Sequence, residues 1–185
     1  MAAGCHETSR RAGFQAIQRH YKSFYKRLEK QGQFPYRVTS RGVWATSTAP
    51  AVYELFRFIR LEKHRLLIDL GSGDGIVVCI ASLFTTAIGI EIDWFLCKLA
   101  AATSRILGLD AQVGFICGDF LKLPIWKADC LYLYPDKPFH ELEVLLRRWS
   151  GRLLVCGNHI PPTRMIAESY FHSGRDKFVV YINPR

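Results

Sequence analysis

The chain has 185 residues, of which 49% are hydrophobic and 22% are charged, and its formal net charge is +9. This length allows one doubly wound sheet and leaves no room for a separate substrate domain, so we expect a single domain over residues 1–185. The longest uncharged stretch, Ile76 to Ile90, is shorter than the roughly 20 residues of a membrane-spanning helix. We therefore expect a soluble protein.

The first predicted element is a basic amphipathic helix at residues 10–31. Nine Lys or Arg and one acid, Glu29, fall within residues 10–41, which therefore carry +8 of the charge. Apolar side chains recur at spacings of three and four residues, which predicts one buried helical face; they are Phe14, Ile17, Tyr21, Phe24, Tyr25 and Leu28. Three roles stay open for this helix: a solvated cap on the sheet, a basic patch for RNA or an acidic protein, and a membrane-surface or transit segment.

Residues 36–50 form a predicted loop between this helix and the core, which we place at residues 51–185. Thr46, Ser47 and Thr48 precede Pro50, and a hydroxyl residue followed by an early proline indicates a helix start. Thr48 is thus a candidate N-cap for a helix that begins near residue 51.

The most informative stretch is a glycine turn between two apolar runs. The first run is Leu66-Leu-Ile-Asp-Leu-Gly-Ser-Gly-Asp-Gly75, and the second, Gly89-Ile-Glu-Ile-Asp93, contains Glu91, 22 residues after Asp69. This order predicts strand, tight turn, helix and strand, which is typical of a nucleotide-type binding crevice.

The spacing of the glycines indicates which ligand the crevice binds. A dinucleotide fingerprint places its third glycine three positions after the second, where this chain has Ile76. A pyrophosphate at a helix N-terminus also disfavours nearby carboxylates, yet Asp69 and Asp74 flank this turn. The crevice therefore suits a cationic ligand without phosphate, and S-adenosylmethionine fits.

The remaining pattern alternates strands and helices. This alternation predicts an α/β, doubly wound, mostly parallel sheet of seven strands that closes with a C-terminal β-hairpin. The predicted elements are a helix at Phe95–Leu107, strands at Val113–Cys117 and Ala128–Leu133, a helix at Lys137–Trp149, a strand at Leu153–Cys156, and closing strands at 165–172 and 177–182.

Five cysteines lie within apolar runs, at Cys79, Cys97, Cys117, Cys130 and Cys156. They form no Cys-x-x-Cys pair, and the histidines do not cluster, so we expect no metal site. We interpret these cysteines as reduced side chains that pack as small apolar residues, which predicts a cytoplasmic protein in a reducing compartment.

Three motifs resemble those of the class I S-adenosylmethionine-dependent methyltransferases. They are Asp69-Leu-Gly-Ser-Gly-Asp-Gly75, the acid Glu91, and Gly118-Asp119-Phe120. The resemblance implies a Rossmann-like fold, S-adenosyl-L-methionine as the cofactor, Glu91 on the ribose hydroxyls and Asp119 on the adenine amino group. The cofactor-binding residues that it implies are Asp69, Gly71, Ser72, Gly73, Gly75, Glu91, Ile92, Asp119 and Phe120.

A narrower resemblance concerns the loop ahead of the first motif. Thr48-Ala-Pro50 is similar, with one residue inserted, to a threonine-proline loop of the small lysine methyltransferases related to the enzyme that acts on the ATP synthase c subunit. The non-SET histone-lysine methyltransferases are more distantly similar. The resemblance implies that this loop, with Thr48, covers the methionine end of the cofactor.

The acceptor should bind where the fourth strand ends, at Leu131-Tyr-Leu-Tyr-Pro-Asp-Lys-Pro-Phe139. Enzymes that methylate amino groups of nucleobases have Asn or Asp, two prolines and an aromatic residue here, and this chain departs from that pattern. Tyr134 and Asp136 are our catalytic candidates, although Tyr134 could merely pack and Asp136 could cap the next helix. Further candidates are Tyr36, Trp44 and His159.

These residues predict methyl transfer to a nitrogen acceptor, most simply a protein lysine held in an aromatic channel near a carboxylate. RNA is the alternative acceptor because of the basic helix. A second alternative is a non-catalytic partner subunit that binds the cofactor.

Overall fold

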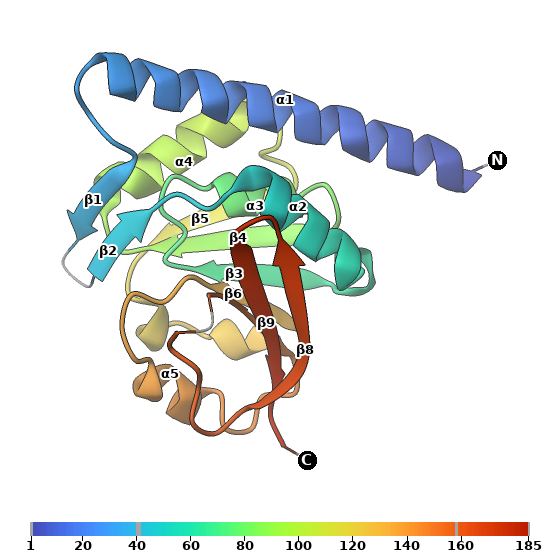
Figure 1. Ribbon diagram of the computed structural model, residues 1–185, viewed down its shortest axis with the longest axis vertical. Helices are drawn as coiled ribbons and strands as arrows, with labels where there is room; N and C mark the ends of the chain where they lie inside the picture. Colours follow the sequence, from blue (N-terminus) through green and yellow to red (C-terminus); the bar gives the residue numbers. More distant parts are fainter. Residues whose placement is uncertain (1, 40–41, 158, 185) are drawn as a thin grey trace.

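The computed structural model describes residues 2–39, 42–157 and 159–184 (Figure 1). A seven-stranded sheet of order β5-β4-β3-β6-β7-β9-β8 forms its centre. Five strands are parallel, and β8 and β9 form an antiparallel hairpin at one edge. The strands are β3 (Leu66–Leu70), β4 (Thr86–Glu91), β5 (Val113–Cys117), β6 (Cys130–Leu133), β7 (Arg152–Cys156), β8 (Ile166–Ser173) and β9 (Asp176–Ile182). The predicted fold class is confirmed.

Side chains of the central strands are buried on both faces of the sheet, and successive residues along a strand belong to opposite faces. Leu67 of β3 packs in a cluster with α1 (Ala2–Lys30), α2 (Ala49–Phe58) and α3 (Ile76–Ala81). The next residue, Ile68, packs in a second cluster with α5 (His140–Leu145) and the turn after it. A further helix, α4 (Trp94–Ile106), contacts β4 and β5. Short 3-10 turns occupy Leu61–Lys63, Phe120–Lys122 and Ile125–Lys127.

The strand order changes direction between β3 and β6. From β3 the chain moves outward through β4 to β5, and it then returns to the other side of β3 with β6. In parallel α/β sheets such a switch point opens a crevice at the carboxyl ends of the strands. The carboxyl ends of β3 and β6 carry the glycine turn and the Tyr134 segment, respectively.

Three predicted elements differ from the structure. The helix predicted at residues 10–31 starts at Ala2, and Glu7 and Arg10 form an i,i+3 ion pair on it. The helix predicted at Lys137–Trp149 spans only His140–Leu145, since Pro138 disfavours helical conformation in the residue before it.

The third difference is in the segment predicted as a loop, residues 36–50. It contains a two-stranded antiparallel sheet, β1 (Tyr36–Thr39) and β2 (Gly42–Ala45). The aromatic and β-branched residues of Tyr36-Arg-Val-Thr39 favour strand conformation. The segment was too short for that alternation to distinguish a hairpin from a loop.

The cysteine prediction holds for four of the five side chains. Cys79, Cys97, Cys130 and Cys156 are buried, whereas Cys117 is exposed. Cys117 ends β5, which is an edge strand of the sheet, so fewer neighbours cover it. Within residues 2–39, 42–157 and 159–184, no helix has the length and apolarity needed to cross a membrane.

Substitution of Gly75 by alanine, compared with the same change at Gly174, tests how tightly the glycine turn packs. Both Gly75 and Gly174 have positive φ angles, +84° and +60°. A Cβ on Gly75 would lie 2.8 Å from the Ala100 Cβ and 2.8 Å from Phe115, whereas one on Gly174 would meet nothing within 4 Å. We expect Gly174→Ala to lose about 1 kcal/mol of unfolding free energy, and Gly75→Ala to lose a further ~1–3 kcal/mol from overpacking. Urea unfolding followed by circular dichroism measures both, and equal losses would contradict the packing argument.

Candidate active site

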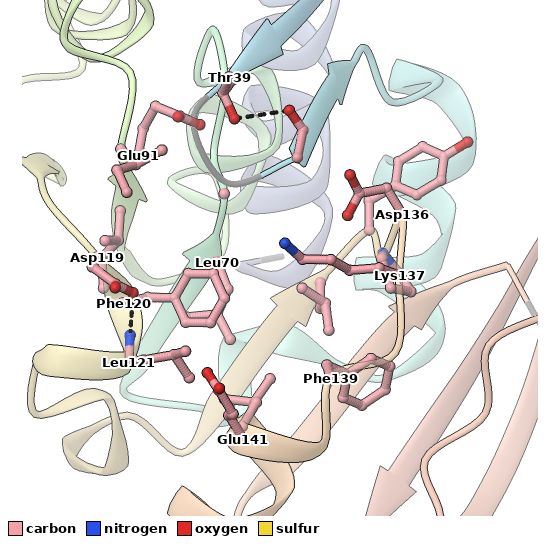
Figure 2. Close-up of a pocket in the computed structure, with 18 of the residues that line it drawn as sticks. Thr39, Leu70, Glu91, Asp119, Phe120, Leu121, Asp136, Lys137, Phe139 and Glu141 are labelled. Atoms are coloured by element: carbon pink, nitrogen blue, oxygen red, sulfur yellow. Dashed lines mark hydrogen bonds between the residues drawn. The ribbon is translucent and has the colours of Figure 1, made fainter.

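A cavity of about 540 Å³ opens at the carboxyl ends of β3, β4, β5 and β6 (Figure 2). Its size lies within the range of small-molecule sites. Glu91 and Asp119 stand on one wall, and Asp136 and Lys137 on the opposite wall. The cavity thus brings together residues from the ends of four strands that are separate in the sequence.

The glycine turn between β3 and α3 forms part of this cavity and needs its glycines for backbone reasons. Gly71, Gly73 and Gly75 all have positive φ angles, a conformation that side chains disfavour. The backbone N–H groups of Gly71 and Ser72 both donate to the Ile90 carbonyl, at 2.9 and 3.0 Å. The alternating glycines therefore let the turn bend back onto the end of β4.

Glu91 links this turn to the start of α4. Its side chain is 4% exposed, and its Oε2 accepts the Gly73 N–H at 2.9 Å while Oε1 accepts the Asp93 N–H at 2.8 Å. Asp93 in turn caps α4 by accepting the Leu96 N–H at 3.0 Å. A carboxylate has four acceptor positions, so Glu91 can hold the turn and still offer oxygen lone pairs to a ligand in the cavity.

The other predicted cofactor residues from the second and third motifs also line the cavity. Ile92 follows Glu91, and Asp119 and Phe120 follow β5. The Asp119 Oδ1 accepts the Leu121 N–H at 3.0 Å, which orients this carboxylate (Figure 2). These residues come together with Gly71 in one cavity, as the motif order implied.

Asp69 and Asp74 place two buried carboxyl groups beside the turn. Burial raises the pKa of Asp69 well above its usual range, and the neighbouring Glu91 and Asp74 carboxylates add to this rise. Burial also raises the pKa of Asp74, to about 6, against the opposing effect of its hydrogen bond from Tyr25. Three carboxylates gathered at one turn favour a cationic ligand.

A smaller cavity of about 20 Å³ lies between the glycine turn and the segment before α2. Asp69, Ser72, Ser47, Tyr132 and Tyr134 are among its lining residues. The Ser47 Oγ lies 3.2 Å from the Tyr132 hydroxyl. Tyr134 also lines the larger cavity, so this side chain stands where the two cavities approach each other.

The two catalytic candidates lie together on the wall formed by the loop after β6. Tyr134 and Asp136 both line the larger cavity, and Tyr134 is 46% exposed. The β1–β2 hairpin closes onto this loop, because a Cβ on Gly42 would meet the Asp136 carboxyl group. At its other end the hairpin is held by an ion pair of 2.9 Å between Arg37 and Asp93.

Other predicted residues lie elsewhere. Thr48 occupies the N-cap position of α2, but its side chain makes no capping hydrogen bond and is exposed. Neither cavity includes Thr48, Tyr36 or His159 among its lining residues. The Trp44 side chain lies outside the described residues. The cofactor role of Thr48 stays a prediction, and its neighbour Ser47 is the hydroxyl residue that reaches a cavity.

Sequence reasoning missed Ser47, Tyr132 and Tyr25. Tyr132 lies in the middle of β6 and looked like a core residue, and burial raises its pKa well above its usual range. Tyr25 belongs to the apolar face of α1, where its hydroxyl group gave no separate signal. Only packing of α1 and β6 against the glycine turn brings these hydroxyl groups to the site.

Comparisons with known proteins agree with this geometry. The family model described as histone methylation protein DOT1 matches residues 25–113, which include the glycine turn and Glu91. No match was found among curated proteins.

Solved structures of methyltransferases share the fold. An RNA methyltransferase from Salinibacter ruber, in complex with S-adenosyl-L-homocysteine, is 24% identical over 76% of this chain and 95% of its own, with a TM-score of 0.68. A methyltransferase from Geobacter sulfurreducens is 14% identical over 88% and 87%, with a TM-score of 0.63. The mitomycin 7-O-methyltransferase MmcR is 15% identical over 73% and 53%, with a TM-score of 0.60.

The fold, the three motifs in one cavity and the family match define a class of enzyme. The chain is a class I S-adenosylmethionine-dependent methyltransferase. S-adenosyl-L-methionine is its cofactor, and the buried carboxylates around the glycine turn fit the positive charges of that molecule.

Glu91→Gln tests the central residue of the site. The amide would turn an N–H group toward the Gly73 or Asp93 N–H, so a buried donor would lose its acceptor. We expect S-adenosylmethionine binding to weaken by at least about tenfold, from the loss of a charge-assisted hydrogen bond. Isothermal titration calorimetry of each variant with S-adenosylmethionine measures this affinity.

Glu141→Gln is the matched control, because Glu141 lines the same cavity but is exposed. Its substitution should change the affinity little. Unchanged binding in Glu91→Gln would show that the second motif has been placed wrongly.

Proposed function

We propose that this methyltransferase transfers a methyl group to a nitrogen acceptor and that the acceptor is a lysine side chain of a protein. The observation that carries the proposal is the pairing of Tyr134 and Asp136 on the wall of the cofactor cavity. An aromatic ring and a carboxylate at one opening suit an alkylammonium group, which both can attract.

The charge around the cavity supports a cationic acceptor. Glu91, Asp119, Asp136 and Glu141 line it, against Lys137 as the only Lys or Arg among the lining residues that the structure describes. An acidic cleft raises the local concentration of a cationic substrate. The phosphate groups of RNA would instead meet repulsion close to the reacting centre.

The chemistry requires little more than positioning. Bound S-adenosylmethionine would supply a methyl group activated by the sulfonium. We propose that Tyr134 orients the lysine amine and that Asp136 accepts its proton, so that the neutral nitrogen can attack in line. The β1–β2 hairpin, through Thr39 and Gly42 on the cavity wall, would exclude water and cover the cofactor.

The comparisons support a protein acceptor only indirectly. The matching family is described as a histone methylation protein, but the match ends at residue 113, ahead of Tyr134 and Asp136. It therefore includes the glycine turn and Glu91, but neither Asp119 of the third motif nor the acceptor candidates. The cavity reaches solvent beside Tyr134, which we expect for an enzyme rather than for a non-catalytic partner subunit.

RNA is the second candidate acceptor, favoured by the exposed face of α1. Arg11, Arg19, Lys22, Lys26, Arg27 and Lys30 are all exposed there, and one structurally similar protein is an RNA methyltransferase. Because Ile17 and Tyr21 of α1 are buried in the core, removing the helix would damage the fold. Neutralising Lys22, Lys26 and Lys30 to Gln instead should abolish low-salt RNA retention if α1 binds RNA.

The acceptor class can be tested with radiolabelled S-adenosylmethionine. We expect the protein fraction of a whole-cell lysate to be labelled, the RNA fraction to stay unlabelled, and the label to be recovered as methyllysine. Glu91→Gln is the control for background. Label confined to RNA would overturn the lysine proposal, and label in neither fraction would direct the search to small molecules.

Tyr134→Phe and Asp136→Asn test the proposed roles once a labelled protein is known. We expect Asp136→Asn to lower kcat by about 100-fold, because it removes the proton acceptor, and Tyr134→Phe to lower it less. Neither change should alter S-adenosylmethionine affinity much, as calorimetry can check. Unchanged kcat in Asp136→Asn would exclude this carboxylate from the reaction.

A further inference from the structure

The inner face of α1 reaches the glycine turn. The Tyr25 hydroxyl donates to the Asp74 Oδ2 at 2.6 Å and lies 2.6 Å from the Thr46 Oγ1. One turn earlier, the Tyr21 hydroxyl donates to the backbone oxygen of Asp74 at 2.9 Å. The helix therefore holds both the side chain and the main chain of Asp74.

The proton count fixes the direction of these bonds. A phenol has one O–H group to donate, and Tyr25 gives it to Asp74. The Thr46 hydroxyl is therefore the donor to the Tyr25 oxygen. Thr46, Tyr25 and Asp74 form a directed chain of hydrogen bonds, and the Ser47 carbonyl oxygen, at 3.4 Å from the Thr46 Oγ1, is a longer alternative acceptor for the Thr46 hydroxyl.

Tyr25 thereby joins two segments that are separate in the sequence. Asp74 belongs to the turn between β3 and α3, and Thr46 to the segment between β2 and α2. The smaller cavity lies between these segments and is lined by Asp74 on one side and by Ser47, the neighbour of Thr46, on the other. The Tyr25 phenol group thus links the two walls of this cavity, and the contact of Ser47 with Tyr132 is a second link at the same place.

We propose that Tyr25 is a positioning residue of the cofactor site. Its hydroxyl fixes the position of the glycine turn relative to the segment before α2, so that α1 helps to form that site. This inference rests on the S-adenosylmethionine assignment and is independent of the lysine acceptor.

The Asp74 carboxyl provides a readout that a purely structural role would not affect. It is 1% exposed, and its pKa lies at about 6. Above this pH Asp74 is ionised and attracts a cationic ligand. As the pH falls through 6, Asp74 takes up a proton and the attraction weakens, so the affinity for S-adenosylmethionine should show a step near pH 6. Removing the Tyr25 donor raises the pKa of Asp74, so this step should move to higher pH.

The other groups that face Asp74 do not produce this step. Tyr21 and Tyr25 of α1 and Cys79 of α3 all have raised pKa values, so they stay neutral near pH 6. Asp69 of β3 is a second carboxyl nearby, and its pKa is also raised. Tyr25→Phe separates the two carboxyl groups, because Tyr25 bonds to Asp74 and lowers its pKa but is not among the groups that shift the pKa of Asp69.

The experiment measures S-adenosylmethionine affinity by calorimetry across the pH range, with no acceptor present. In Tyr25→Phe we expect binding at neutral pH to weaken by about tenfold, the size of one lost charge-assisted bond, and the midpoint of the pH step to rise. Tyr53→Phe is the matched control: its ring stacks on Phe14 of α1, and its buried hydroxyl has no hydrogen-bond partner among the described residues. It should change neither quantity.

Asp74→Asn is the second variant and keeps the side-chain shape. The step near pH 6 should disappear in it, and adding Tyr25→Phe should then change the affinity less than it does in the wild type. Loss of thermal stability in Tyr25→Phe with unchanged affinity and midpoint would overturn the proposal. If Tyr25→Phe does not fold, Thr46→Val decides: weaker cofactor binding than in Tyr53→Phe supports the proposal, and equal binding overturns it.

Discussion

The cofactor site depends on one buried carboxylate, Glu91, which accepts hydrogen bonds from the backbone of two separate segments. Glu91 accepts N–H groups from Gly73 and Asp93, so that the glycine turn after β3 and the start of α4 are fixed to the end of β4. The turn can take this shape only because its glycines adopt positive φ angles. A ligand that meets Glu91 therefore meets a turn whose N–H groups are already oriented.

The same turn explains the distribution of charge in the molecule. Asp69, Asp74 and Glu91 are buried around it, and burial keeps the pKa of the first two high. The Glu91 and Asp74 carboxylates raise the pKa of Asp69, and a cationic cofactor would relieve that repulsion. Six exposed basic residues lie apart from them on the outer face of α1. This helix has seven Lys or Arg against two Glu, so it carries +5 of the net charge of +9, and the net charge does not describe the active site.

The cofactor half of the site was predictable because its signals are local. A turn that needs three glycines, a carboxylate at a strand end and a capping aspartate after the next strand each lie within a few residues of the sequence. The β1–β2 hairpin was taken for a loop because each of its strands has only four residues. Tyr132 was not recognised as a residue of the smaller cavity because its contact with Ser47 joins segments 85 residues apart. Tyr134 and Asp136 were named from their place after a strand, and the cavity does contain both.

The sequence by itself determined the sheet, the glycine turn and the class of cofactor, since strand alternation and turn glycines are constraints of the local backbone. Only the tertiary structure decided that α1 is part of the cofactor site. Its periodic pattern predicts a buried face but cannot say what that face contacts. Packing brings Tyr25 to Asp74 and Thr46, because a helix buries its apolar side wherever the sheet leaves a face uncovered.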